Sequence, residues 1–91
     1  MIEIREQRET EKMTWHEANE GAERGWRLPS MGELRLIGNN LTPGTYWSGS
    51  EYAPFPYDAW GFLTYYGGQD HYDKGNQLYA WFVRDVKEIT E

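Results

Sequence analysis

The most constraining stretch of the sequence is Gly25-Trp26-Arg27-Leu28-Pro29-Ser30, a short extended segment between two helix-like segments. Pro29 disfavours a helical conformation at Leu28, so one helix must end before Trp26 and the next can begin only after Pro29. Trp26 and Leu28 alternate with Arg27 and should point inward. Arg27 is expected to hold loop carbonyls or a carboxylate with its planar guanidinium. We expect this segment, called the hinge below, to be buried.

Two Ser/Thr-x-x-Glu patterns predict where the helices begin. Ser30-Met31-Gly32-Glu33 and Thr14-Trp15-His16-Glu17 have the form of a capping box, in which the hydroxyl and the carboxylate each accept from the other residue's amide. The first helix is predicted from about Trp15 to Arg24, with Gly25 ending it in a left-handed conformation. The second helix is predicted to bury three residues of one face, namely Leu34, Ile37 and Leu41.

From Tyr46 onward the pattern becomes that of strands, and thirteen of the fifteen aromatic residues lie between Tyr46 and Phe82. Loops rich in Pro, Gly, Asp and Asn separate three predicted strands of an antiparallel meander, which are residues 46–50, 59–66 and 77–86. Ile2 and Ile4 alternate with charged residues and predict a short edge strand. The last strand is long enough to pair with it. The chain is therefore predicted to form an α+β fold.

Length and composition narrow the possible functions. Ninety-one residues make a single domain, residues 1–91, and the absence of cysteine excludes disulfides, thiolate metal sites and a cysteine nucleophile. Such a chain suits a reducing compartment, and the first residues contain no apolar run of signal-peptide length, so we expect a cytoplasmic protein. An excised extracellular module would have the same composition.

The charge of the chain also excludes some partners. A formal net charge of -6 is the opposite of a nucleic-acid footprint, and no segment is long and apolar enough to cross a bilayer. We therefore expect neither nucleic acid nor membrane as a partner. An acidic surface can, however, attract a basic protein.

Several motifs occur in the order of a known family: Trp15 with Ala18, the hinge with Glu33-Leu34, Tyr46-Trp47-Ser48, Ala59-Trp60 and Val83-Arg84. On these motifs the chain resembles the C-terminal domain of Lcl-type collagen-like adhesins, which belongs with C-type-lectin-like and formylglycine-generating-enzyme-like folds. The resemblance runs from about Thr14 to Val86 and implies two helices packed on a twisted antiparallel sheet with paired terminal strands. The family's usual cysteines, the catalytic cysteines of the enzymes and the calcium motifs of the lectins are absent.

Histidine, serine and glycine motifs do not predict catalysis. Asp70-His71-Tyr72-Asp73, with Asn76 nearby, could hold a cation, but the calcium-loop spacing fails and we interpret the segment as a solvated turn. Ser48 lacks a nucleophile elbow, and the glycines at 67, 68 and 75 lack the features of a phosphate loop. His16 is expected at the surface or stacked on a neighbour. We predict no enzyme activity, no metal site and no cofactor.

The remaining signal is an excess of aromatic residues in two predicted loops, residues 51–58 and 67–76. These rings could cover the sheet, or they could form a binding surface. We predict a non-enzymatic binding module that recognises a protein partner, with a glycan as the second choice. Its candidate binding residues are Tyr52, Phe55, Tyr57, Tyr66, His71 and Tyr72.

Two alternative functions stay open from the sequence. One is a small acidic inhibitor or regulator that blocks a basic cleft of a host or partner protein, in which case charge reversals at Glu17, Glu20 and Glu23 should abolish binding. The other is a degenerate enzyme domain. Acidic blocking should weaken steeply with ionic strength, whereas an aromatic contact should not.

Overall fold

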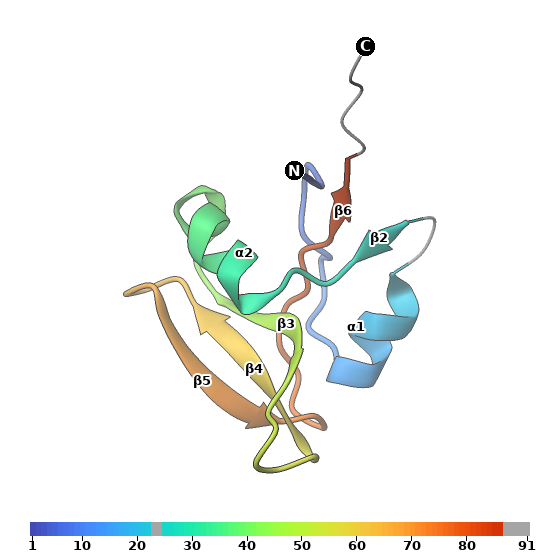
Figure 1. The fold of residues 1–91 in the computed structure, drawn as a ribbon, viewed down its shortest axis with the longest axis vertical. Coiled ribbons are helices and arrows are strands. Elements are labelled where there is room, and N and C mark those ends of the chain that lie inside the picture. The colour runs from blue at the N-terminus through green and yellow to red at the C-terminus, as the bar shows by residue number, and fades with distance from the viewer. Residues whose placement is uncertain (23–24, 87–91) are drawn as a thin grey trace.

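The computed structural model describes residues 1–22 and 25–86 and shows an α+β fold of two α-helices and two three-stranded antiparallel sheets (Figure 1). The first sheet has the order β1-β6-β2, with strands Ile2–Ile4, Val83–Asp85 and Trp26–Arg27. The second is a meander in the order β3-β4-β5, with strands Thr45–Glu51, Asp58–Leu63 and Gly68–Asp73. The strands thus divide between two sheets, where the sequence predicted one.

Helix α1, Trp15–Gly21, begins as the sequence predicts. The Thr14 hydroxyl accepts from the Glu17 amide at 3.3 Å, and the Thr14 amide donates to the Glu17 carboxylate at 2.8 Å, so the capping box is confirmed. The helix ends earlier than expected. At its end, the Ala22 amide donates to the Asn19 carbonyl at 3.3 Å. Residues 23–24, the predicted last residues of this helix, lie outside the described residues. Gly25 has the predicted left-handed conformation, with φ of 85°.

Helix α2, Met31–Ile37, also begins at a capping box. The Ser30 hydroxyl accepts from the Glu33 amide at 3.2 Å, and the Ser30 amide donates to the Glu33 carboxylate at 2.8 Å. A short 3-10 helix, η1, Gly38–Asn40, follows it. Leu34 and Ile37 are buried on α2 as predicted. Leu41 is buried too, but it follows η1, because α2 ends at Ile37, earlier than predicted.

The hinge between the helices is only partly buried. Leu28 is buried as predicted, whereas Trp26 is half-buried. The guanidinium groups of Arg5 and Arg84 lie 5.3 Å and 4.7 Å from the Trp26 ring. Two guanidinium groups therefore cover part of the Trp26 ring, whereas the sequence predicted that this ring would be buried.

Arg27 of the hinge connects three elements. Its two terminal nitrogens each donate to the Glu33 carboxylate at 2.7 Å, and its Nη2 and Nε donate to Asp85 at 2.9 Å and 3.2 Å. Nη1 also donates to the Leu28 carbonyl at 3.2 Å. The predicted role of Arg27 is confirmed: its planar fork ties the hinge to α2 and β6.

The third strand of the meander was wrongly predicted. It is β5, which lies in the segment predicted as the loop 67–76, and not residues 77–86. Of that later segment only β6 is a strand, while Leu78 and Tyr79 make isolated bridges to Met13 and Tyr46. The residues of β5 are mostly polar, so the sequence pattern does not indicate a strand. Pairing with β4 along all six residues imposes the extended conformation. The predicted pairing of the terminal strands is confirmed, with Ile2 opposite Asp85.

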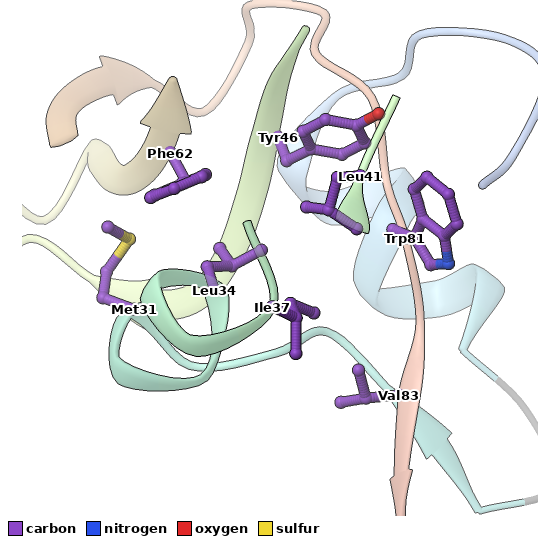
Figure 2. Close-up of a cluster of buried hydrophobic side chains, with 8 residues drawn as sticks. All are labelled: Met31, Leu34, Ile37, Leu41, Tyr46, Phe62, Trp81 and Val83. Carbon is purple, nitrogen blue, oxygen red and sulfur yellow. The ribbon is translucent and has the colours of Figure 1, made fainter. Parts of the chain in front are cut away.

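Two apolar clusters lie on opposite faces of the meander. Figure 2 shows the first, whose side chains come from α2, the end of η1, β3, β4, β6 and the segment before β6: Met31, Leu34, Ile37, Leu41, Tyr46, Phe62, Trp81 and Val83. The second contains Ala18, Leu28, Trp47, Ala59, Ala80 and Phe82. Alternation along β4 sends Phe62 to the first cluster and Ala59 to the second. The meander is therefore fixed on both faces, which leaves its ends and loops to carry a site.

Candidate binding site

The candidate site is built on the loop between β3 and β4, whose backbone is held by its own hydrogen bonds. The Tyr52 amide donates to the Asp58 carbonyl at 3.0 Å, and the Asp58 amide donates to the Phe55 carbonyl at 3.0 Å. The Phe55 amide donates in turn to the Tyr52 carbonyl at 3.1 Å. Residues 52–58 therefore form a closed turn whose conformation is fixed by hydrogen bonds within the loop.

Lys74, just after β5, clamps this loop from the side. Its ammonium donates to the Glu51 carboxylate at 2.7 Å and to the Pro56 carbonyl at 2.8 Å, and its amide donates to the Tyr57 carbonyl at 2.8 Å. The ammonium also lies 4.5 Å from the centre of the Trp15 ring. Only 12% of the Lys74 side chain is exposed, and its contacts join the loop to α1.

His71 belongs to a ring cluster at the base of the loop. Its imidazole stacks on Tyr52 with 4.0 Å between ring centroids and 2° between planes, and its Nδ1 lies 2.7 Å from Asp58 Oδ2. The Trp60 and Phe55 rings pack at 6.0 Å and 6.4 Å from it. The interpretation of residues 70–73 as a solvated turn was wrong, because β5 pairing places His71 opposite Trp60.

Two rings project from this base into solvent. Phe55 is 56% exposed and Tyr57 is 76% exposed, and both lie in the loop fixed by Lys74. Large apolar side chains held outward on a fixed loop contribute little to folding, whereas they contribute much contact area when a partner covers them. The loop therefore has the properties of a preformed contact surface.

The structure separates the other predicted binding residues from this surface. Tyr66 is exposed at the β4–β5 turn, at the opposite end of a hairpin whose strands are roughly 20 Å long. Tyr72 is half-buried on the other face of the sheet, where its ring meets Trp47 edge-on at 6.4 Å. Burial raises the pKa of the Tyr72 hydroxyl. Tyr52, Phe55 and His71 are thus brought together, with Tyr57 beside them.

The sequence analysis missed two residues of this site and one exposed ring far from it. Asp58 and Trp60 belong to the ring cluster, and Tyr65 is a second exposed ring, at 74%, on the distant turn. The spacing of Asp58, Trp60 and Phe62 along one strand face was the signal that could have found the first two. No comparable signal separated Tyr65 from its neighbour Tyr66.

A pocket of about 390 Å³ adjoins the loop, between α1 and the end of β5. It is lined by Thr14, His16, Pro56, Tyr57, Asp73, Lys74 and Gly75. His16 is exposed as expected, with its ring edge-on to Trp15 at 5.4 Å. The Asp73 carboxylate accepts from the Gly75 amide at 2.7 Å. The pocket combines an aromatic wall with a carboxylate, a combination suited to binding a ligand.

Another hollow, of about 550 Å³, lies along residues 3–10 beside Trp26. Its two arginines lie over aromatic rings: Arg5 over Trp26, and the Arg8 guanidinium 3.6 Å from the centre of the Tyr79 ring. The buried Nη1 of Arg8 has no hydrogen-bond partner among the described residues. The nearby Arg8 guanidinium lowers the pKa of the Tyr79 hydroxyl. Despite its larger volume, this hollow shows no exposed ring comparable with Phe55 or Tyr57. We therefore place the candidate site at the loop.

The described residues, 1–22 and 25–86, contain no group of three or more His, Asp or Glu side chains arranged to hold a metal ion. No helix in this part of the chain is long and apolar enough to cross a membrane. No protein-family model matches the sequence, and no curated protein matches it either. The function must therefore be inferred from the geometry of the loop and its pocket.

Proposed function

We propose that this protein is a non-enzymatic, C-type-lectin-like binding module that recognises a partner protein through the rings of its β3–β4 loop. One observation carries the proposal: Phe55 and Tyr57 are exposed on a loop whose backbone groups and adjoining cation are already engaged within the protein. A loop fixed in this way loses little conformational entropy on binding, so the contact energy of its rings is available for affinity.

A protein partner fits this surface better than a glycan does. Sugar rings bind flat on exposed aromatic faces, but His71 already covers one face of Tyr52 at 4.0 Å. Phe55 and Tyr57 instead protrude from the loop, as the anchors of protein interfaces do when they enter a partner's pocket. We keep a glycan as the second ligand class.

The resemblance to the C-terminal domain of Lcl-type collagen-like adhesins is part of the same proposal. Two helices and paired terminal strands agree with it. A chain without cysteine suits a reducing compartment, which supports the cytoplasm as its place of action. Fold alone assigns no function, so the proposal depends on the loop.

The alternative function is an acidic inhibitor that blocks a basic cleft. Glu17 and Glu20 are exposed on α1, which favours this alternative, while Glu23 lies outside the described residues. Charge reversal at Glu20 should abolish or strongly weaken binding by such an inhibitor and should leave a contact centred on the loop much less affected. Glu17 is less suitable for this test, because it caps α1.

The test begins with a pull-down from the native host, followed by affinity measurements on variants of the purified protein. Tyr57→Ala and Phe55→Ala should each weaken binding by about 1–2 kcal/mol, since each removes one anchoring ring. Tyr65→Ala is the matched control, because Tyr65 is equally exposed at the far end of the hairpin. Normal binding by both loop variants would refute the proposal, and loss of binding only on charge reversal at Glu20 would favour the inhibitor.

A further inference from the structure

We infer that the partner presents an arginine, whose side chain enters the pocket between Tyr57 and Asp73. This inference rests on the proposed function and specifies the chemistry of the partner. Two features of this pocket support it: an exposed aromatic wall and a carboxylate beside that wall.

The pocket has the size and walls for one long side chain. Its volume is about 390 Å³, and Pro56 and Tyr57 give it an apolar side that could pack against three methylene groups. Asp73 lines the same pocket. The contact of Asp73 Oδ1 with the Gly75 amide, at 2.7 Å, fixes the carboxylate in place and leaves further acceptor capacity on its oxygens.

Among the described residues, 1–22 and 25–86, no cation pairs with the Asp73 carboxylate. The ammonium of Lys74, which lines the same pocket, donates to Glu51 at 2.7 Å and to the Pro56 carbonyl at 2.8 Å. The Lys74 ammonium is therefore already bound to Glu51 and Pro56. A cation from the partner could form an ion pair with the Asp73 carboxylate.

The surrounding charges also favour a cation. The meander from Thr45 to Gly75 contains four carboxylates and one ammonium, which is the clamped Lys74. Glu17 adds another carboxylate beside the pocket, since it accepts from the amide of Thr14, a lining residue. That hydrogen bond lowers the pKa of Glu17, so this carboxylate is charged at neutral pH. Such a field attracts a basic segment and disfavours an acidic one.

Arginine fits this pocket better than lysine does. A guanidinium can stack its flat face on the Tyr57 ring while its edge donates two parallel hydrogen bonds to the Asp73 carboxylate. An ammonium is a compact, strongly hydrated charge and can make only the second contact well. A pocket with one aromatic wall and one carboxylate therefore selects for the planar cation.

The experiment is a selection of random 12-residue peptides displayed on phage against the full-length protein, followed by affinity measurements on synthetic copies of the selected peptides. Arginine should be enriched in them. Replacing the arginine by glutamine should weaken binding at least about tenfold, and replacing it by lysine should weaken binding several-fold. Binding should also weaken as the salt concentration rises, because the pairing lies near the surface.

Two matched variants locate the contact. Asp73→Asn removes the charge but keeps an oxygen for the Gly75 amide, and it should weaken the peptides about tenfold. Asp70→Asn is the control: it makes the same change on the same strand, but Asp70 pairs with Gly61 on the other face, away from the pocket. Its effect should stay below about twofold.

The outcomes separate this inference from the proposed function. Peptides that lose affinity with Tyr57→Ala, but lack arginine and tolerate Asp73→Asn, would overturn the arginine pocket and leave the loop as the contact surface. Peptides that tolerate both Tyr57→Ala and Phe55→Ala would overturn the proposed function and this inference together.

Discussion

The hinge and the β3–β4 loop each use one cation to fix a bend of the chain, yet they treat apolar side chains in opposite ways. In the hinge, Arg27 holds Glu33 and Asp85, and the neighbouring Leu28 is buried. In the loop, Lys74 holds Glu51 and the Pro56 carbonyl, and the neighbouring rings face solvent. The same kind of contact thus accompanies a buried apolar side chain in one region and exposed rings in the other.

The largest effect should come from the core beside the hinge. Leu34 is fully buried in the first apolar cluster, so Leu34→Ala should lower the free energy of unfolding by about 2–5 kcal/mol. Leu36 is the matched control, because it lies in the same helix but is 82% exposed. Leu36→Ala should change stability by less than about 0.5 kcal/mol. Chemical denaturation of both variants measures the difference, and equal losses would contradict the core assignment.

The hinge could be predicted from the sequence because its signals are local. A proline fixes where a helix can begin, and a Ser-x-x-Glu pattern closes within four residues, so Ser30 and Glu33 identify each other without tertiary context. The buried face of α2 follows from helical spacing in the same way. Trp26 escaped the prediction because the arginines that cover it come from residues 5 and 84, at the two ends of the described chain.

The meander and the site could be predicted only in part, because their conformation depends on pairing. Residues 68–73 are polar and lack the usual strand pattern, yet β4 imposes an extended conformation on them. His71 therefore meets Tyr52 and Asp58 through a register that no local motif encodes. Composition did predict an excess of rings in the 51–58 loop, but it could not predict which rings converge.

The second largest effect should follow from removing the cation of the hinge. Arg27→Met should lower stability by about 1–2 kcal/mol at pH 7, a modest value because more than a third of the side chain is exposed. Arg35→Met, on the exposed side of α2, should have little effect and serves as the control. Thermal unfolding of both variants measures the difference.

The pH dependence sharpens this test. Hydrogen bonding to Arg27 lowers the pKa of Glu33 below its ordinary value of 4.5. A lowered folded-state pKa contributes stability that is present above 4.5 and is lost as the pH falls through the folded value. The gap between the wild type and Arg27→Met should therefore be full at pH 7 and should shrink below about pH 4.5. A gap that is constant down to pH 2 would show that Arg27 acts through packing alone.

A smaller effect is expected from the cation of the loop. Lys74→Met keeps the length of the side chain but removes the bonds to Glu51 and Pro56, and it should lower stability by about 1 kcal/mol. The local effect should be clearer, because the amides of Phe55 and Asp58 should exchange hydrogen faster once the loop is released. Lys12→Met, at an exposed position, is the control. Unchanged hydrogen-exchange rates at these amides would contradict the role of Lys74 in holding the loop.

The smallest effect on stability should come from the rings themselves. Phe55→Ala and Tyr57→Ala should each change the free energy of unfolding by less than about 0.5 kcal/mol, because most of each side chain already faces solvent. Thermal unfolding measured beside Leu34→Ala provides the scale. A loss comparable with that of Leu34→Ala would mean that the loop rings belong to the core, and the contrast between hinge and loop would disappear. If stability is retained, any loss of partner binding by these two variants reports on the contact itself, since the loop backbone is held by Lys74 and its own hydrogen bonds and not by the rings.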